Sequence, residues 1–292
     1  MLTASNRGFK GSNRSLFNRD VIVLEPKRGW ASLELRQLWD YRELLFFLTW
    51  RDILLRYKQA VLGITWAILQ PLLTMVVFTV VFNKGLKVET GDKNLPYAVF
   101  SFSGLLPWQF FAGALTRSTT SVVGNSNLVT KVYFPRLVIP MSAVLGVLID
   151  FVLSFIVLLI LMAAYGIAPG WEIALLPAFV VLIIATALSV GLWMSAINVL
   201  YRDVQYIIPF VVQLWMFVSP VIYPLEETWP EWLRVLFSLN PMTGVINGFR
   251  WSLLGQPFDA RYLGISTAVV VVLLVGGLFY FKRTERVFAD VV

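Results

Sequence analysis

Long uncharged stretches dominate the sequence, and short clusters of charge separate them. Five stretches contain no charged residue and a sixth contains one acid, Asp150; together they cover residues 59–83, 94–116, 137–171, 173–201, 204–225 and 262–281. The hydrocarbon core of a bilayer, about 30 Å thick, needs about 20 apolar residues per helix. The pattern predicts an all-α integral membrane protein with six transmembrane helices, the third and fourth joined by a tight turn at 166–171.

The composition agrees with a membrane protein and excludes most enzyme chemistry. Only 14% of the 292 residues are charged and 58% are hydrophobic, whereas soluble domains carry about 25% charged residues. The sequence has no Cys and no His, which excludes disulfides, thiol nucleophiles, imidazole catalysis and zinc or haem ligation by these residues. It also lacks a G-x-x-x-x-G-K-[ST] phosphate loop and a G-x-S-x-G elbow, so we expect no catalytic residues, no metal site and no ATP site of that kind.

The lysines and arginines predict the orientation in the membrane. With six spans both termini lie on one side, and that side carries eighteen of the 24 basic residues. Because short cytoplasmic loops are enriched in Lys and Arg, both termini are expected in the cytoplasm. The net charge of +7 is then mostly this topological bias, and no nucleic-acid partner is expected.

Two segments precede the first predicted span. Residues 1–29 are polar and basic and lack the apolar stretch of a signal peptide, so they are expected to remain as a cytoplasmic tail. In residues 30–58, leucines and aromatic residues share a helical face opposite Arg36, Asp40 and Glu43. Such an amphipathic helix lies in the membrane interface. It serves either as a surface anchor or as a helix against which a cytoplasmic partner pushes.

The cytoplasmic loop 117–136 contains the signals of a short helix. Asn125 or Ser126 can cap the helix at its N-terminus, and Pro135 stops it. A rigid helix lying on the membrane surface suits force transmission from a partner. Most loops of this length are only connectors, however, so the pattern leaves both roles open.

The external segment 223–261 contains a second unusual run. Residues 235–249 carry no charge but are too short to cross a bilayer, and Asn240-Pro241 and Gly244 interrupt them. This arrangement favours a re-entrant or interfacial helix pair over a seventh span. Such a pair either lines an exit or caps the helix bundle.

Asp150 is the one acid inside a predicted span. At a rise of 1.5 Å per residue it lies about 20 Å from the cytoplasmic end, and an unpaired carboxylate there costs several kcal/mol. A structural partner such as Asn198, Gln213 or Arg250 is the favoured explanation. Proton coupling is the alternative, although a lone acid without a basic partner in another span supports it weakly.

Aromatic residues make up 15% of the chain, and several lie deep in predicted spans. Trp66, Phe78 and Phe82 fall in the first span, and Trp215 and Phe217 in the fifth. Aromatic rings stack on the C–H faces of sugars, so a lining of them would suit a sliding glycan. Lipid-facing or core packing is the commoner role of such residues.

Four segments resemble the permeases of type-2 ABC exporters of the polysaccharide class. They are RYKQAVLGITWAILQPLLTMVVFTVVF (56–82), LVTKVYFPRLVIPMSAVLGVLIDF (128–151), YRDVQYIIPFVVQLWMFVSPVIYP (201–224) and LNPMTGVINGFRWSLLG (239–255). They occur in the family's order and spacing, and the resemblance covers residues from about 30 to 285. It is closest to the Wzm-type permeases that export O-antigen, a part of lipopolysaccharide, with teichoic-acid and capsule exporters as more distant relatives.

The resemblance implies an assembly and a location. The chain would be the transmembrane subunit of a homodimer in the bacterial cytoplasmic (inner) membrane, paired with two copies of a separate ATPase subunit that binds ATP and Mg. Residues 30–58 would be the interface helix, 59–285 the six-span permease domain with external re-entrant helices between spans five and six, and 286–292 the cytoplasmic C-terminus. No cofactor would bind to this chain itself.

The resemblance also implies roles for individual residues. The first and fifth spans of both protomers would enclose a channel lined by Trp66, Phe78, Phe82, Trp215, Phe217 and Tyr223. Two cytoplasmic segments, 124–133 and 201–206, would contact the ATPase through Asn125, Ser126, Asn127, Leu128, Lys131, Tyr133, Arg202 and Asp203. The diphosphate of an undecaprenyl-linked polysaccharide would meet Arg51, Arg56 and Lys58, because cations of this kind bind phosphate.

Three other functions remain as alternatives to polysaccharide export. A type-2 ABC exporter of drugs or lipids would show ATPase activity stimulated by small molecules and no effect on surface glycan. A proton-driven carrier that uses Asp150 would need a pH gradient and no ATPase partner. A membrane glycosyltransferase is the weakest alternative, because paired acids in a metal-binding arrangement are not evident.

Overall fold

The computed structural model describes residues 35–58, 63–88, 90–91, 95–225 and 228–291. The chain divides into two units, Met1–Ser32 and Leu33–Val292. The first unit, with the predicted tail 1–29, lies outside the described residues, as do residues 30–34 of the predicted interface helix and 59–62 at the start of the first predicted span.

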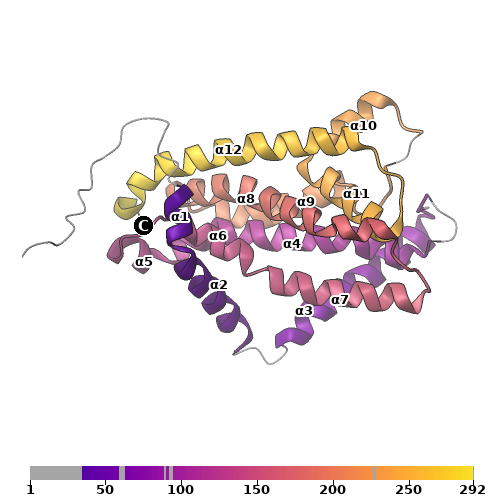
Figure 1. Ribbon diagram of the computed structural model, residues 1–292, viewed down its shortest axis with the longest axis horizontal. Coiled ribbons are helices and arrows are strands. Elements are labelled where there is room, and N and C mark those ends of the chain that lie inside the picture. The colour runs from indigo at the N-terminus through magenta and orange to yellow at the C-terminus, as the bar shows by residue number, and fades with distance from the viewer. Residues whose placement is uncertain (1–34, 59–62, 89, 92–94, 226–227, 292) are drawn as a thin grey trace, which may run out of the picture. The chain divides into compact units, whose positions relative to one another are not determined.

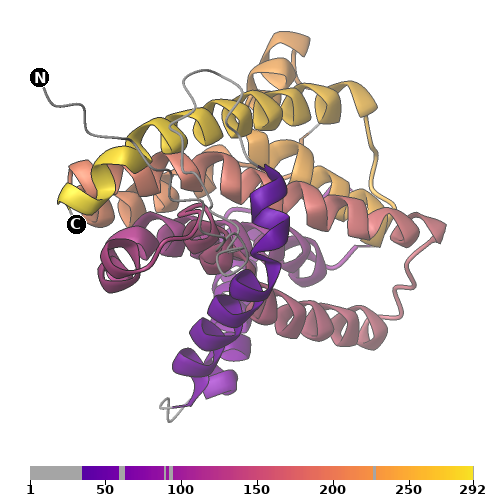
Figure 2. The same cartoon turned by 60° about the vertical axis from the view of Figure 1, so that its left-hand side comes forward.

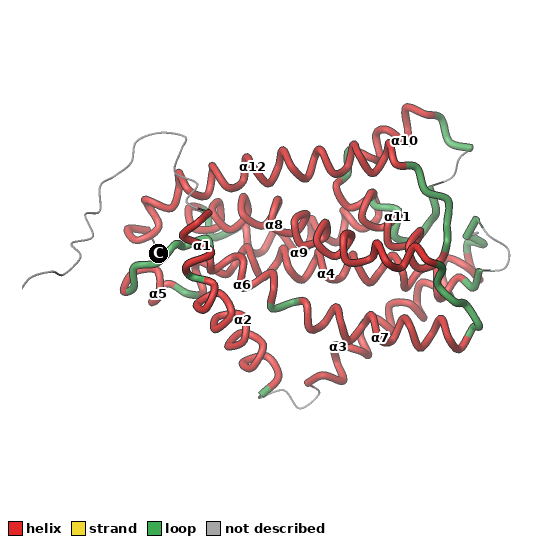
Figure 3. Tube along the Cα trace, in the orientation of Figure 1, coloured by secondary structure: helices red, strands yellow, loops and turns green. Residues whose placement is uncertain are grey.

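Every regular element in the described part of the second unit is a helix, as Figure 3 shows. The α-helices are α1 Leu35–Asp40, α2 Arg42–Tyr57, α3 Gly63–Phe78, α4 Tyr97–Gly124, α5 Ser126–Lys131, α6 Val138–Leu145, α7 Leu148–Ala164, α8 Leu176–Leu200, α9 Val204–Val218, α10 Glu231–Ser238, α11 Pro241–Leu254 and α12 Ala260–Val291. A π-helical segment, η1 Thr79–Gly85, continues α3, and a 3₁₀ turn, η2 Trp171–Leu175, precedes α8.

Five helical segments are long and apolar enough to cross a bilayer. They are Thr65–Gly85, Tyr97–Gly124, Val138–Ala164, Trp171–Leu200 and Ala260–Phe288. The remaining predicted span, 204–225, contains the apolar helix α9, which has only 15 residues. Its α-helix ends at Val218 because Pro220 disfavours a helical conformation at Ser219, whose backbone is extended. The multi-span helical fold is confirmed, and the count of six stays a prediction.

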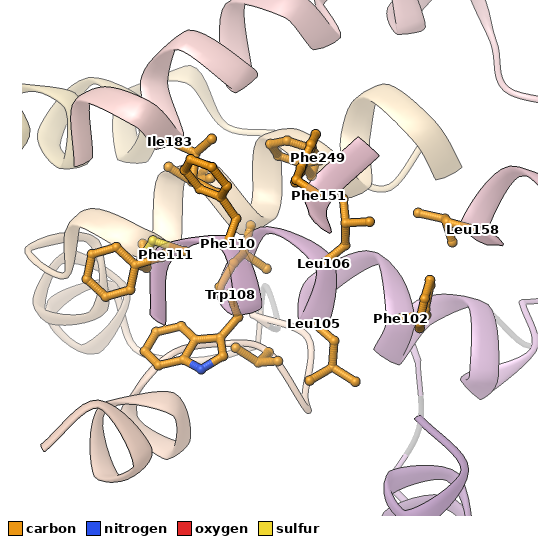
Figure 4. Packing of buried hydrophobic residues seen from close by; sticks show 14 of the residues in the cluster. Phe102, Leu105, Leu106, Trp108, Phe110, Phe111, Phe151, Leu158, Ile183 and Phe249 are labelled. Carbon is orange, nitrogen blue, oxygen red and sulfur yellow. The ribbon is translucent and has the colours of Figure 1, made fainter. Parts of the chain in front are cut away.

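The central helix of the second unit is α4, and the core forms around it. In the most apolar 18-residue stretch of α4, 78% of the residues are buried. In the corresponding stretches of the other four long segments the buried share is 17–33%. Figure 4 shows phenylalanine, leucine and tryptophan side chains of α4 meeting residues of three other helices. The Phe110 ring packs edge-on against Phe151 of α7 at 5.7 Å, and Phe151 packs in the same way against Phe249 of α11 at 5.9 Å.

A glycine sets the distance between α4 and α8. A Cβ added at Gly191 of α8 would lie 2.7 Å from Oγ of Ser118 on α4. Both residues are fully or almost fully buried. Small residues allow the backbones of membrane helices to approach closely, so this pair explains how the two long helices pack side by side.

The two ends of the second unit differ in their elements. One end, here called the α5 end, carries α1, α2, α5 and the last turns of α12, as Figures 1 and 2 show. A small core holds it together, formed by side chains that include Leu48, Val129, Phe134, Phe281 and Phe288. The opposite end, the α11 end, carries α10 and α11 (Figure 1).

The predicted amphipathic segment is mostly helical in its described part. It forms two helices, α1 and α2, that are interrupted at Tyr41. The buried residue of α2 is Leu48. Several large apolar side chains remain exposed, as expected for a helix pair in a membrane interface; they are Trp39, Phe46, Phe47, Trp50, Leu54 and Leu55.

The helix pair predicted around 235–249 is also present, as α10 and α11. The break falls at Asn240, whose Oδ1 accepts a hydrogen bond of 3.1 Å from the backbone N–H of Met242. Pro241 follows at the first position of α11, where its missing N–H costs no hydrogen bond. Local capping chemistry therefore explains the break, while re-entry of this pair into the membrane stays a prediction.

Candidate functional site

The carboxylate of Asp150 lies where the end of α2 meets the beginning of α7. Arg56 forms an ion pair with one carboxylate oxygen, and the Tyr57 hydroxyl donates a hydrogen bond to the other. Partial burial, reinforced by this hydrogen bond, raises the pKa of Tyr57 to about 12. Tyr57 therefore remains a protonated donor at neutral pH.

The partners expected for Asp150 were wrong. Asn198 accepts a hydrogen bond of 3.1 Å from the backbone N–H of Gln205 instead. Arg250 donates to backbone carbonyls, and Gln213 is exposed on α9. The actual partners belong to α2, because the chain breaks between α6 and α7 at Gly146–Val147 and places Asp150 in the first turn of α7, beside the end of α2.

A cavity of about 760 Å³ opens beside this ion pair, between α2, α3, α4, α7 and α9. Such a volume is within the range of small-molecule sites, about 300–1,000 Å³. Trp66, Phe110 and Phe151 supply aromatic walls. The larger polar residues of the lining are Arg56, Tyr57, Gln70, Gln109, Arg117 and Asp150.

Arg117 of α4 is the second cation of this pocket. From the sequence it was only one of the basic residues that predict the orientation in the membrane. No hydrogen bond or ion pair joins its side chain to another residue of the described ranges. It is also exposed, whereas Arg56 is partly buried. Arg117 directly follows the uncharged stretch 94–116, and α4 continues to Gly124; a single cation between two uncharged runs was the signal that could have identified it.

The three predicted diphosphate contacts have different surroundings, and their role stays a prediction. Arg56 lines the pocket. Arg51 pairs with Asp52 at 2.8 Å and also donates a hydrogen bond of 2.8 Å to Oδ1 of Asn125. Lys58 is exposed at the end of α2. Of the three, the pocket therefore includes Arg56 and adds Arg117.

At the α11 end, Arg250 is fully enclosed and bonds to the chain that follows α9. Its guanidinium donates hydrogen bonds of 2.7 Å to the carbonyls of Pro220 and Val221 and one of 3.3 Å to that of Tyr223. The same group lies 3.7 Å from the centre of the Phe100 ring, a cation–π contact. Arg250 therefore joins α4, α11 and the end of α9.

Comparison with known proteins places the chain in a family. The sequence profile of ABC-2 type transporters matches residues 43–254. The chain belongs to the ABC-2 type transporter family. The matched range includes α3 to α11 and most of α2, and therefore contains the whole pocket.

Several curated relatives of this ABC-2 chain are named as polysaccharide transport proteins. The O-antigen export system permease protein RfbA of Myxococcus xanthus is 34% identical over 87% of this chain and 97% of its own length. A protein of the same name from Klebsiella pneumoniae is 28% identical over 85% and 95%. The polysialic acid transport protein KpsM of Escherichia coli is 24% identical over 80% and 91%.

The six aromatic residues predicted to line a channel differ in their surroundings within the ABC-2 chain. Trp66 and Phe217 are each 49% exposed, whereas Phe78 is 8% exposed and packs edge-on against Phe82. Trp215 is half-buried and donates a hydrogen bond of 3.1 Å to Asn240. Tyr223 is also half-buried and contacts the ring of Trp229. Trp66 and Phe217 are thus the most accessible of the six.

The residues predicted to contact an ATPase lie on or near the surface of the α5 end. Most are exposed, notably Tyr133 at 76%, while Asn125, Ser126 and Leu128 are partly buried. Asn125 does not cap α5 with its side chain. Its amide instead donates to the carbonyl of Ser121 at 2.9 Å and accepts the bond from Arg51. The exposed members that the structure describes are Asn127, Lys131, Tyr133, Arg202 and Asp203.

Proposed function

We propose that this ABC-2 protein is the permease subunit of an ATP-driven exporter that moves a lipid-linked polysaccharide such as O-antigen across the cytoplasmic membrane. The observation that carries the proposal is the 34% identity to the O-antigen export permease of Myxococcus xanthus, over 97% of that protein. The Klebsiella relative of the same name supports the same substrate class. In this proposal the protein is multi-pass and both termini are cytoplasmic, so the α5 end faces the cytoplasm.

ATP hydrolysis belongs to a separate partner in this proposal. The sequence has no phosphate loop. The exposed residues on and after α5, and between α8 and α9, offer a docking surface for an ABC ATPase that binds ATP and Mg. The homodimer would carry two copies of this ATPase. Arg51 links α2 to the start of α5 through Asn125. Movement of α5 by the ATPase would therefore reach α2 directly.

The permease acts as a homodimer in this proposal. Apolar side chains on α3, η1 and α9 remain exposed in the single chain, and they are Leu69, Leu73, Val76, Val77, Val80, Val81, Ile207, Phe210, Val211, Leu214, Phe217 and Val218. A second copy and lipid would cover these faces. The polymer would pass between the protomers along α3 and α9, where Trp66 and Phe217 offer exposed rings.

The alternatives to O-antigen export differ in their support. The relative named as a polysialic acid transport protein favours a capsular polymer as the second candidate; teichoic acid, lipid or drug export has no comparable support. A proton-driven carrier is disfavoured, because Arg56 and Tyr57 occupy both oxygens of Asp150.

Deletion of the gene, combined with purification of the tagged chain in mild detergent, tests the proposal. We expect surface glycan to disappear and lipid-linked polymer to accumulate inside the cell, while a stoichiometric ABC ATPase copurifies. Complementation by the wild-type chain is the control. The proposal would be contradicted if the chain purified without an ATPase. It would also be contradicted if the deletion strain had unchanged surface glycan and increased sensitivity to small molecules.

A further inference from the structure

We propose that the pocket beside Asp150 binds the diphosphate headgroup of the lipid-linked substrate, with Arg117 as the open cation and Asp150 as an internal anion that the headgroup displaces from Arg56. This inference rests on the proposed function, which supplies a lipid-linked substrate, and it names where and how that substrate is first held.

The charges of the pocket lining favour an anionic ligand. Arg56 and Arg117 oppose one acid, Asp150, among the lining residues. The guanidinium of Arg117 has no hydrogen bond or ion pair with any described residue. Arginine presents a planar set of donors that suits phosphate oxygens. Within the described part of the chain, one cation is therefore available without breaking a hydrogen bond or an ion pair.

A second donor is unused even on the paired arginine. The Nε atom of Arg56 is buried and has no hydrogen-bond partner among the described residues. A buried donor without a partner costs free energy, and a phosphate oxygen in the pocket would satisfy it. Gln70 and Gln109 add neutral donors to the same lining.

The shape of the pocket suits a headgroup with an attached chain. Its volume of about 760 Å³ exceeds what a diphosphate alone fills. Trp66, Phe110 and Phe151 provide apolar wall next to the charged groups, so an isoprenoid segment or a first sugar fits beside the phosphates. The lining comes from α3, α4, α7 and α9 as well as α2, so the headgroup would contact both helices of the proposed path, α3 and α9, within one protomer.

Substitution of Asp150 distinguishes this proposal from a purely structural role for its ion pair with Arg56. If Asp150 only holds α2 against α7, its loss should loosen the protein and weaken any ligand. If the headgroup competes with Asp150 for Arg56, then Asp150→Asn should strengthen binding of a diphosphate, because the competing charge is gone while Tyr57 and the side-chain shape remain.

The test uses the full chain with its copurified ATPase in nanodiscs of zwitterionic lipid and measures binding of radiolabelled farnesyl diphosphate. We expect Arg117→Gln to weaken binding about tenfold, the loss of one charged hydrogen-bonding group, and Arg117→Lys to weaken it less. Asp150→Asn should bind several times more tightly than the wild type. Arg261→Gln, an exposed arginine outside the pocket, is the matched control and should change nothing.

Competitors distinguish the possible sources of the phosphate. Displacement by farnesyl diphosphate but not by phosphatidylglycerol at the same concentration supports a headgroup site, and partial displacement by inorganic pyrophosphate supports recognition of the diphosphate itself. Equal displacement by phosphatidylglycerol, or unchanged binding in Arg117→Gln with normal size-exclusion behaviour, overturns the site. That failure leaves polymer export by the wild-type chain intact, whereas loss of the proposed function would appear as unchanged surface glycan in the deletion strain.

Discussion

Arg51 of α2 donates a hydrogen bond of 2.8 Å to the side-chain oxygen of Asn125, between α4 and α5. The two residues are 74 positions apart in the chain. The Asn125 amide also donates to the carbonyl of Ser121 in the last turns of α4. One side chain therefore joins the amphipathic helix, a long apolar helix and the short helix proposed to contact the ATPase.

Breaking this bond should reduce the coupling between ATP hydrolysis and transport. We expect Arg51→Ala and Asn125→Ala each to lower polymer export, with ATPase activity retained, because the ATPase still docks on α5 but α2 no longer follows. Removing a hydrogen bond from a charged donor costs about 1.5–3 kcal/mol. In a double-mutant cycle the two effects should be non-additive; fully additive losses would show that the residues act separately.

The two deep tryptophans should respond differently to substitution. Trp66 is half exposed in the pocket, so Trp66→Ala is expected to lower export severalfold and leave the apparent melting temperature unchanged. Trp215 donates a hydrogen bond to Asn240, and its ring packs edge-on against Phe111 with 5.2 Å between the ring centres. Trp215→Ala should therefore lower both export and the melting temperature, with a loss of about 1–3 kcal/mol in stability. Trp171→Ala, at an exposed position, is the control. Normal export in Trp66→Ala would exclude a role in the substrate path.

Substitution of Arg250 should be among the most destabilising changes at the α11 end. Arg250→Gln leaves the carbonyls of Pro220 and Val221 without their charged donor, at about 1.5–3 kcal/mol per bond. We expect a clear fall in the melting temperature of the detergent-purified protein. Arg261→Gln, an exposed position, should leave it unchanged.

The space for the Arg250 guanidinium also depends on Gly104. A Cβ at Gly104 would lie 2.7 Å from Nη2 of Arg250 and 2.9 Å from the carbonyl oxygen of Val221. Gly104→Ala should therefore destabilise the protein through the same contacts. Gly124→Ala is the matched control, because nothing lies within 4 Å of the added atom; equal melting temperatures for the two variants would contradict the packing argument.

Tyr57 should titrate later than an ordinary phenol. Its pKa is raised to about 12, mainly by burial and also by the hydrogen bond to Asp150, whereas an unfolded chain has a tyrosine pKa of about 10. The neutral phenol therefore favours the folded protein fully below about pH 10, and this contribution disappears as the pH rises from about 10 to 12. The difference between the ultraviolet titration curves of the wild type and Tyr57→Phe measures the pKa of Tyr57. A difference curve with its midpoint near pH 10, the ordinary tyrosine value, would show that Tyr57 is not enclosed.

Helix content and the polar ends of the spans were predictable because they depend on local requirements. A bilayer demands long uncharged helices with satisfied backbone groups, so stretches such as 94–116 identify α4 before any contact is known. The break between α10 and α11 was equally local, since Asn240 and Pro241 are cap and first-turn residues. α9 is shorter than its uncharged run because Pro220 ends the helical backbone.

The pocket required the tertiary structure. The sequence alone determined a multi-span helical membrane protein, a family resemblance and a set of candidate cations and aromatic residues. Only the packing of α2 beside the first turn of α7 decided that Asp150 pairs with Arg56 and Tyr57, and that Arg117 shares their cavity without a hydrogen bond or ion pair to any residue that the structure describes. The physical reason is distance along the chain: ion pairs and buried contacts between residues such as Arg56 and Asp150, 94 positions apart, depend on helix packing that no local pattern records.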